Sequence, residues 1–304
     1  MSKTAGSVQA PSATSPLLWF ALVGIGIAWG STQVFSKIIV NEGHHPFGIS
    51  LVTISLGVMM ITAFLVARGV KLPFGRRHLV YYAICGLLGT ALPNYTAYTS
   101  IRELPVGIVS IILAAVPLKT FLIAMMFRVE RPEPRRLIGL LAGAGAVVLL
   151  VGPEASLPRA GDTLWVGVAL ITGLSYAIEN VYIAKARPED CGALQTLCGL
   201  SWMAFLMILP VTALTGTWMD MSDFGAAHYS AAAIAVLHLV AYGGFVWLIG
   251  RAGPVFAAQV GYVVTLSGVA LGIAVFDEAH SGWVWSALAL MLAGLALVQP
   301  RPSR

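Results

Sequence analysis

The sequence predicts an all-α integral membrane protein with ten transmembrane helices arranged as two inverted five-helix repeats. Three observations support this prediction: the apolar composition, the spacing of the apolar runs, and the similarity between the two halves of the chain. Of 304 residues, 58% are hydrophobic and 10% charged, with a mean hydropathy of +0.85, whereas soluble domains carry about 25% charged residues. A membrane-spanning helix needs about 20 apolar residues, and ten such runs follow one another along the chain.

The connections between these runs are short and carry Gly, Pro or charged residues, which mark turns. They leave no room for a soluble domain, so we expect one bundle. Residues 1–16 are rich in Ser, Thr, Ala and Pro. We expect them to form a disordered cytoplasmic tail rather than a signal peptide, because no short apolar core with a cleavage site follows. The helices are expected to start near Leu17, Pro46, Leu79, Leu104, Arg136, Thr163, Gly192, Ser230, Pro254 and Gly282.

The basic residues separate clearly between the two sides of these ten helices. Fourteen of the eighteen Lys and Arg residues fall on the side of the N-terminus, and only Lys37, Arg102 and Arg159 fall on the other, with Lys119 inside a helix. Short loops rich in Lys and Arg stay in the cytoplasm. We therefore predict a multi-pass protein of the bacterial inner membrane with both termini cytoplasmic. The net charge of +5 reflects this topology and attraction to anionic lipids, so no nucleic-acid partner is expected.

The two halves of the chain resemble each other at a nearly constant offset. An offset of 149 aligns RELPV (102–106) with RAGPV (251–255), Phe127 with Phe276, and Gly145 with Gly294. An offset of 147 aligns WGSTQVF (29–35) with YAIENVY (176–182). We predict a first repeat over 17–152 and a second over 163–300. Because five is an odd number, the second repeat must enter the membrane inverted, as in many secondary transporters.

Several motifs resemble a known family. They are WGST in the first helix, LPVG and GPVF at the starts of the fourth and ninth, F-x-x-E at Phe127–Glu130, F-D-E at Phe276–Glu278, and the Gly-rich fifth and tenth helices. Together they are similar to the EamA-type branch of the drug/metabolite transporter superfamily, from about residue 17 to 300. The resemblance implies a ten-helix exporter of amino acids or other metabolites, a group that includes the YddG-type aromatic amino-acid exporters. FRVE departs from the small, Gly-containing turn usual before the Glu.

Two charged side chains lie deep in the predicted helices, Lys119 in the fourth and Glu179 in the sixth. A lysine near the middle of a spanning helix costs about 2.5–3.5 kcal/mol on insertion scales. Both helices run from the outside inward, and Lys119 lies roughly 4.5 Å past the midpoint at 1.5 Å per residue. Glu179 lies at a similar depth. We expect the two to form a pair lining a cavity; the alternative is that Lys119 extends toward cytoplasmic headgroups.

Aromatic and amide side chains are predicted to surround this pair. Tyr176, Glu179 and Asn180 share one helical face because they are three and four residues apart. Pro93 frees a backbone carbonyl that neighbours or cavity water must satisfy. The predicted substrate-binding residues are Trp29, Gln33, Asn94, Tyr98, Lys119, Tyr176, Glu179, Asn180, His238, Tyr242, Gln259 and Tyr262. Such a ring suits a small zwitterion or a planar apolar solute, although helix packing or an interfacial belt explains any single aromatic equally well.

These residues favour an exporter of amino acids or similar metabolites, with aromatic or apolar ones preferred. A multidrug or organic-cation exporter using Glu179 is the alternative if Lys119 points elsewhere. An intramembrane serine protease using Ser175 and His238 is a distant alternative, because bulky Tyr176 follows the serine and activation of a nucleophile needs more than a Ser and a His. We expect no enzyme activity.

Phosphorylated substrates are not expected, since their recognition needs several cations. The sequence has no nucleotide-binding motif, so transport is expected to use the solute gradient or protons, with Glu179 and His238 as candidate carriers. Two cysteines, Cys85 and Cys198, lie inside helices and Cys191 lies in a loop, a scatter that predicts no disulfide framework. No metal or cofactor is expected. The expected partners are a small-molecule substrate and the lipid bilayer, with a monomer as the working assumption.

Overall fold

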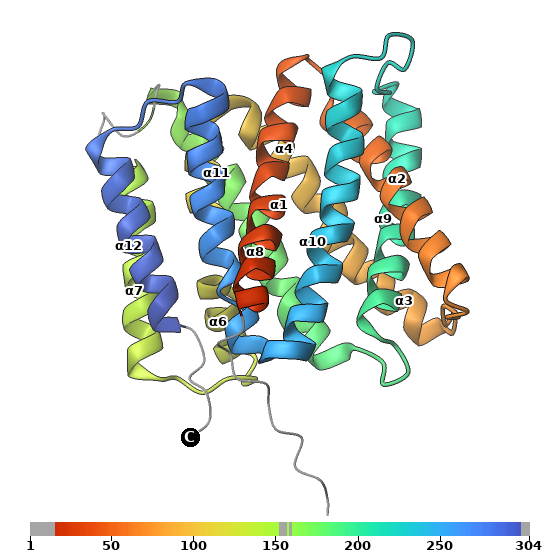
Figure 1. Cartoon of the computed structure of the whole chain (residues 1–304), viewed down its shortest axis with the longest axis horizontal. Coiled ribbons are helices and arrows are strands. Elements are labelled where there is room, and N and C mark those ends of the chain that lie inside the picture. The colour runs from red at the N-terminus through yellow and green to blue at the C-terminus, as the bar shows by residue number, and fades with distance from the viewer. Residues whose placement is uncertain (1–15, 152–156, 158–159, 299–304) are drawn as a thin grey trace, which may run out of the picture.

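The computed structural model describes residues 16–151, 157 and 160–298, without the side chains of 160, 250 and 253–255. Over this range the chain consists of helices and connections (Figure 1). The predicted tail lies outside the described residues except for Pro16, which begins the first helix. Residue 152 and residues 299–300 of the predicted repeats also lie outside them.

The first half of the chain crosses the bundle five times, and two of these crossings are broken. The helices are α1 (Pro16–Asn41), α2 (Pro46–Ala67), α3 (Arg76–Gly86), the π-helical η1 (Leu87–Ala91), α4 (Leu92–Glu103), α5 (Val106–Leu113), α6 (Val116–Met126) and α7 (Pro134–Val151). Each break precedes a proline, Pro93 near the start of α4 and Pro117 near the start of α6. Proline removes a backbone donor and so interrupts the helical hydrogen-bond pattern.

The second half also crosses five times, after the short 3-10 helix η2 (Ala160–Asp162). Its helices are α8 (Thr163–Ala186), α9 (Ala193–Thr215), α10 (Ala226–Ala257), α11 (Val260–Phe276) and α12 (Gly282–Val298). The predicted start of the ninth crossing near Pro254 is wrong, because α10 continues through this position and α11 begins at Val260. Figure 1 shows the end of α10 turning across the base of the bundle before α11 rises, as expected of a helix that proline bends.

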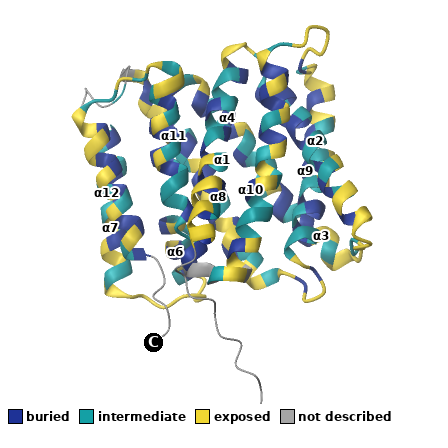
Figure 2. Cartoon of the chain, viewed as in Figure 1, coloured by how far each residue is buried: buried dark blue, intermediate teal, exposed yellow. Residues whose placement is uncertain are grey.

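The helices of the two halves together form ten membrane crossings. Among the described residues, seven segments are long and apolar enough to span a bilayer: α1, α2, the combined α5 and α6, α7, α8, α9 and α10. The apolar helices α11 and α12 are shorter, and the combined α3, η1 and α4 completes the set. Large apolar side chains such as Phe20, Val66 and Leu214 are exposed along the bundle (Figure 2). In a membrane protein this surface contacts lipid.

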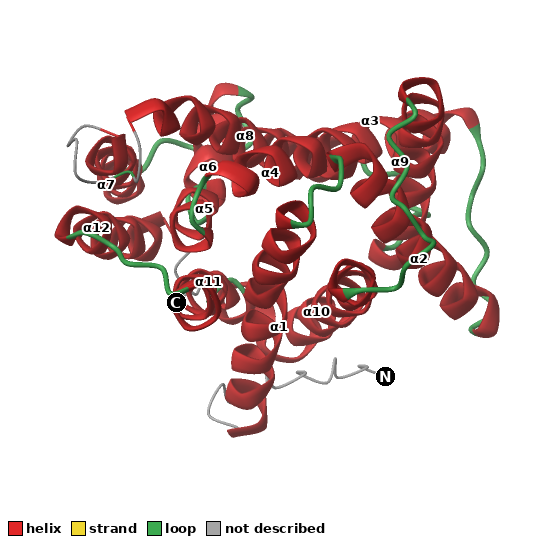
Figure 3. Ribbon diagram, turned by 90° about the horizontal axis from the view of Figure 1, so that it is seen from above, coloured by secondary structure: helices red, strands yellow, loops and turns green. Residues whose placement is uncertain are grey.

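The second half is inverted relative to the first. In Figure 1, α1 runs from the lower edge to the upper edge and α8 runs from the upper edge to the lower one, while α1 begins and α12 ends at the same lower edge. Contacts between the halves follow one rule: α1 packs on α10 and α11, and α8 packs on α4 and on α5 and α6. Helix α2 meets α9 at one end of the bundle, and α7 meets α12 at the other (Figure 3). Exchanging the halves leaves this pattern unchanged, as an inverted repeat requires.

A detail of the backbone repeats in both halves. Arg128 and Asp277 have φ angles of 56° and 51°, and no other described non-glycine residue has a positive φ. Arg128 directly follows Phe127 and Asp277 directly follows Phe276, the two residues that the offset of 149 aligns. Both fourth and ninth crossings therefore end in the same left-handed turn, which glycine adopts most easily. The bounds of the repeats, 17–152 and 163–300, stay a prediction.

Candidate functional site

The site begins where Pro93 interrupts the third crossing. In η1 the N–H of Leu92 donates to the carbonyl of Leu87, five residues earlier, so the next such bond would run from residue 93 to the carbonyl of Leu88. Proline has no N–H to give. The Ser175 hydroxyl of α8 donates to the Leu88 carbonyl instead, at 2.7 Å. A neighbouring side chain thus satisfies the freed carbonyl, as the sequence predicted.

Glu179 lies one turn further along this face of α8, with only 9% of its surface exposed. Its carboxylate rests against Gly89 of η1, in space that any larger side chain at 89 would fill. Among the described residues, it forms no hydrogen bond and no ion pair that would neutralise it. Glu179 lies within electrostatic range of the tyrosine hydroxyls of Tyr176 and Tyr242, and Tyr98 lies within range of Tyr176. The structure therefore brings one carboxylate and three predicted tyrosines together.

Lys119 does not pair with Glu179, which corrects the expectation of an ion pair. Its ammonium donates to the backbone carbonyl of Leu170 in α8 at 3.0 Å, and it occupies the space left by Gly173, where an added Cβ would lie 2.6 Å from it. Leu170 precedes Glu179 by nine residues, which is about 180° around a helix of 3.6 residues per turn. Lys119 and Glu179 contact opposite faces of α8. A backbone carbonyl is one of the usual partners of a charge inside a membrane.

Asn180 belongs with Lys119 rather than with Glu179. Its amide donates to the hydroxyl of Thr120 at 3.3 Å, and the residue is exposed. Thr120 follows Lys119 on α6. Both polar contacts join α6 to α8, so these two predicted site residues form a helix contact rather than part of the tyrosine cluster.

Trp29 and His238 form a second group across α1 and α10. Their rings meet edge to face with centroids 6.2 Å apart, and the Phe245 ring also meets Trp29 edge to face, at 5.8 Å. On α10, His238 continues the stripe of Ile234 and Ala241, which are buried, yet His238 itself is exposed. A residue on an inward stripe is accessible only if it faces an open interior. The structure thus places His238 at a solvent-accessible space between α1 and α10.

The remaining predicted residues are spread more widely. Gln33 and Asn94 are half-buried on α1 and α4. Gln259 is the residue directly before α11, and its side chain makes no capping hydrogen bond. Tyr262 is half-buried and lies within electrostatic range of Arg135 of α7. The structure does not place Gln259 and Tyr262 beside Glu179. That the twelve residues line one binding site stays a prediction.

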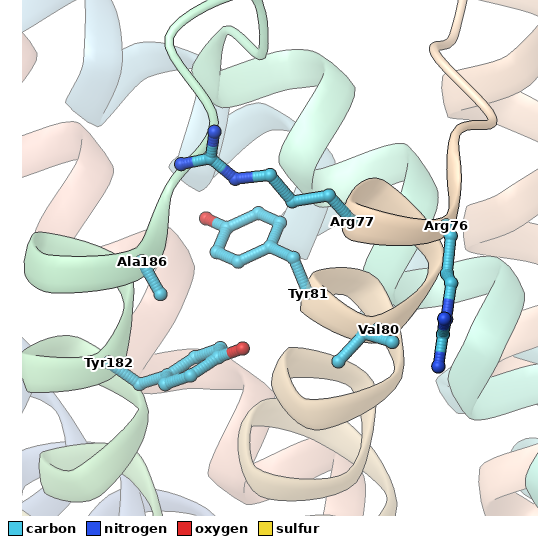
Figure 4. Close-up of a pocket in the computed structure, with 6 residues that line it drawn as sticks. All are labelled: Arg76, Arg77, Val80, Tyr81, Tyr182 and Ala186. Atoms are coloured by element: carbon cyan, nitrogen blue, oxygen red, sulfur yellow. The ribbon is translucent and has the colours of Figure 1, made fainter.

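Two cavities open at the lower edge of the bundle, beside the end of α8. One, of about 580 Å³, is lined by Arg76, Arg77, Val80, Tyr81, Tyr182 and Ala186. Figure 4 shows the Tyr81 and Tyr182 rings facing each other across it, with Arg77 above Tyr81; the rings are 5.9 Å apart and nearly parallel. The other, of about 330 Å³, lies between α6 and α8 and includes Phe127 and Lys185. Sequence reasoning missed both, because the residues of each come from helices far apart in the chain.

The polar side chains of the site also show which chemistry it supports. Ser175 donates to Leu88 and forms no contact with His238, so it has a structural partner rather than an activating base. Thr172, one turn before Ser175, shares a 2.7 Å hydrogen bond with Thr96 of α4. No group of three or more metal-ligating side chains occurs in the part of the chain that the structure describes. The cluster offers one carboxylate and several aromatic rings, which suits binding of a positively charged or amine-bearing solute.

Comparisons with known proteins agree with this architecture. The EamA-like transporter family matches residues 16–152. YedA of Escherichia coli strain K12, described as an uncharacterized inner membrane transporter, is 30% identical over 291 residues, covering 92% of this chain and 90% of YedA. A probable terminal-alkyne amino-acid exporter of Streptantibioticus cattleyicolor is 26% identical over 203 residues, 65% of this chain and 64% of the relative.

A solved crystal structure shows the same fold, with a TM-score of 0.61 at 19% identity, and the match covers 92% of this chain and 94% of that one. YedA covers almost the whole chain at 30% identity, and both named relatives are transporters. The protein is a multi-pass membrane transporter, and the apolar helices agree with the inner-membrane location of YedA. The chain belongs to the EamA-like transporter family.

Proposed function

We propose that the protein exports amino acids or similar small metabolites, aromatic or apolar ones preferred, by alternating access around the interior that His238 and the tyrosine cluster face. The observation that carries the proposal is Glu179, a buried carboxylate without a cationic partner among the described residues. A carboxylate is expensive to keep in a membrane unless it has a function. An ammonium group of the substrate is the partner that the site lacks.

The tyrosines beside Glu179 support recognition of an ammonium group. Tyr98, Tyr176 and Tyr242 come from α4, α8 and α10, so the cluster spans both halves of the bundle, where secondary transporters bind their substrates. The faces of aromatic rings attract cations, and their bodies suit an apolar side chain. The named amino-acid exporter among the relatives gives independent support for a substrate of this class.

Export of organic cations is the second candidate, and the position of Lys119 favours it. An amino acid carries a carboxylate as well as an ammonium group, and Lys119 contacts the opposite face of α8. It is therefore not available beside Glu179 to bind that carboxylate. A cationic amine needs only the Glu179 carboxylate and the aromatic rings, whereas an amino acid must find donors for its carboxylate among hydroxyl and amide groups.

Counterflow in liposomes distinguishes the two candidates. Liposomes that contain the purified protein are loaded with unlabelled tyrosine or tyramine, which differ only in the carboxylate. Uptake of each labelled compound into these liposomes is then measured. An amino-acid exporter exchanges tyrosine at least about tenfold better, a ratio typical of sites that bind a polar group specifically. An organic-cation exporter prefers tyramine. Glu179→Gln should abolish either activity; unchanged flux in this variant would remove Glu179 from the site.

We propose further that the lower edge of the bundle faces the cytoplasm, from the distribution of Lys and Arg. Single cysteines are introduced in a background without the three native cysteines and treated with an impermeant thiol reagent in intact cells. Cysteines at His44 and Asp220, at the upper edge, should react. Cysteines at Arg77 and Arg135, at the lower edge, should be protected. The reverse pattern would show the opposite orientation.

A further inference from the structure

The joint between α4 and α5, at Leu104 and Pro105, is held by a lysine of the first helix. The Lys37 ammonium donates to the carbonyl oxygens of Ile101, Arg102 and Leu104, at 2.7, 3.0 and 3.1 Å. These carbonyls lie at the C-terminal end of α4, where the helix dipole favours a cation. Lys37 therefore ties the upper end of α1 to the end of α4.

A carboxylate from the other half of the chain holds the same joint from its other side. Glu278, between α11 and α12, accepts hydrogen bonds from the backbone N–H groups of Val106 and Gly107, at the N-terminal end of α5. Burial opposes its ionisation, but His280 beside it and these two donors outweigh burial and hold the pKa of Glu278 below its usual value. An anion is favoured at the N-terminus of a helix.

The two contacts at this joint come from different halves of the chain. Lys37 belongs to the first half and Glu278 to the second, and both act on a joint whose flanking residues, Leu104 and Val106, have no exposed surface. The joint lies within the main apolar core, with Ile39 of α1 and Ile49 of α2 also fully buried. Each contact is a hydrogen bond between a charged side chain and the backbone, which is stronger than one between neutral groups.

Among the described residues, the corresponding joint of the second half shows neither contact. Glu130 comes three residues after Phe127, one residue beyond the position that aligns with Glu278. It accepts a hydrogen bond from Arg136 at 3.2 Å and is half-exposed. Lys185 lies one residue beyond the position that aligns with Lys37, and its ammonium lies over the Phe127 ring, 5.6 Å from the centroid. In the part of the chain that the structure describes, these two side chains have partners other than the joint between α10 and α11.

The helices before the two joints also end at different positions relative to the aligned residues. Helix α4 ends at Glu103, directly before the joint, so its last carbonyls are free to accept hydrogen bonds from Lys37. Helix α10 continues six residues past Arg251, which aligns with Arg102, and ends at Ala257. Carbonyls within a helix are already paired. The carbonyls of residues 250, 251 and 253, which align with the acceptors of Lys37, therefore lie within α10.

We propose that Lys37 and Glu278 are gating residues that hold the upper side closed, and that Lys185 and Glu130 take their place at the lower joint in the opposite conformation. The proposal rests on alternating access, part of the proposed function. His238 is accessible while the joint at the upper edge is buried in the apolar core, which supports a conformation open on the lower side. Exchange of equivalent contacts between the halves is how an inverted repeat can form two mirror-related states.

A cysteine at position 238 reports on which side is open. In a background without native cysteines, His238→Cys is reacted with an impermeant maleimide added from the upper or the lower side of reconstituted vesicles of sorted orientation. In the parent protein, the reagent should react faster from the lower side. Adding Lys37→Met or Glu278→Gln should raise the rate from the upper side about tenfold, because loss of a charged hydrogen bond shifts the equilibrium toward the open state.

Lys185→Met and Glu130→Gln are the matched controls, because they remove the same chemical groups from the lower edge. They should not raise the rate from the upper side. The proposal is overturned if neither Lys37→Met nor Glu278→Gln raises it, or if the control variants raise it equally. If one variant does not fold, the other decides, because each acts on a different end of the joint. The labelling experiment needs no substrate, so its result is independent of the counterflow test. Transport can still be measured if the gating proposal is wrong, and labelling can still be measured if the proposed substrate is wrong.

Discussion

Lys119 of α6 donates its ammonium to the backbone carbonyl of Leu170 in α8, at a distance of 3.0 Å, on the face opposite to Glu179. Residues that share no partner usually contribute to stability independently. Lys119→Met and Glu179→Gln should therefore have additive effects on the free energy of unfolding. A double-mutant cycle from thermal unfolding in detergent should give a coupling energy within about 0.5 kcal/mol of zero.

Gly173→Ala gives the matching check on the Lys119 contact. A methyl group at 173 would meet the ammonium, so this variant should lose stability in the presence of Lys119 and lose less in the Lys119→Met background. A coupling energy of roughly 1 kcal/mol or more between Lys119 and Glu179 would show instead that the two side chains form an ion pair. In that event the two charges must meet in a conformation other than the one described here.

The sequence placed Lys119 and Glu179 at a similar level, which agrees with the contact between their neighbours Thr120 and Asn180, but it did not predict the direction of the two side chains. Depth follows from counting residues along each apolar run, because a helix rises a constant distance per residue. Direction depends on how α6 and α8 pack, and the contacts that decide it, such as Leu170 with Lys119, join residues far apart in the chain. Pro93 shows the same limit. The freed carbonyl could be predicted from the proline alone, whereas its donor, Ser175, is 87 residues away.

The site was accordingly predicted in part. The stripe of Tyr176 and Glu179 could be read from their spacing, and the structure keeps both near Tyr98. Gly89 carried no periodic signal, yet its missing side chain makes room for the Glu179 carboxylate. Gln259 was expected inside the ninth crossing because the start was placed at Pro254, whereas α10 continues through 254 and Gln259 directly precedes α11.

Gly89→Ala should impair transport without unfolding the protein. The three atoms nearest to the added methyl group all belong to the Glu179 carboxylate, the far end of a flexible side chain, so we expect Glu179 to move and the backbone to stay in place. Displacing a binding group by about 1 Å can lower a rate up to a hundredfold. We expect export by Gly89→Ala to fall roughly ten- to hundredfold, with a melting temperature close to that of the parent.

Gly57→Ala is the matched control, because a methyl group at 57 in α2 meets nothing within 4 Å. This variant should keep full export and gain about 0.5–1 kcal/mol, the usual difference between Ala and Gly inside a helix. Export and thermal unfolding of both variants are measured in the same preparation. Equal export by the two would show that the position of Glu179 does not matter for transport.

Arg128→Gly should stabilise the protein. Arg128 has a φ of 56°, a left-handed conformation that costs a residue with a side chain roughly 1–2 kcal/mol and costs glycine almost nothing. Part of this gain is lost because glycine is more flexible in the unfolded chain. We expect a net increase of about 0.5–1 kcal/mol in the free energy of unfolding, measured by thermal or denaturant unfolding in detergent.

Asp277→Gly is the comparison at the equivalent turn of the second half, where φ is 51°. Aspartate adopts the left-handed region more readily than arginine does, because its short side chain can hydrogen-bond locally. The gain at 277 should therefore be smaller than the gain at 128. A larger gain at 277 would mean that the side chains, rather than the shared backbone conformation, determine the stability of these turns.

The stability of the protein should fall at acid pH through Glu278. Because its folded-state pKa lies below the usual value of 4.5, Glu278 stabilises the fold fully above that value, and the contribution is lost as pH falls through the lower, folded pKa. Glu278→Gln should cost roughly 1.5–3 kcal/mol at pH 7, the range for hydrogen bonds to a charged group. The gap in melting temperature between parent and variant should narrow as pH falls below 4.5. Glu130→Gln removes an exposed carboxylate paired with Arg136 and should cost no more than about 1 kcal/mol at pH 7. A gap for Glu278→Gln that stays constant down to acid pH would mean that the charge on Glu278 does not hold the joint between α4 and α5.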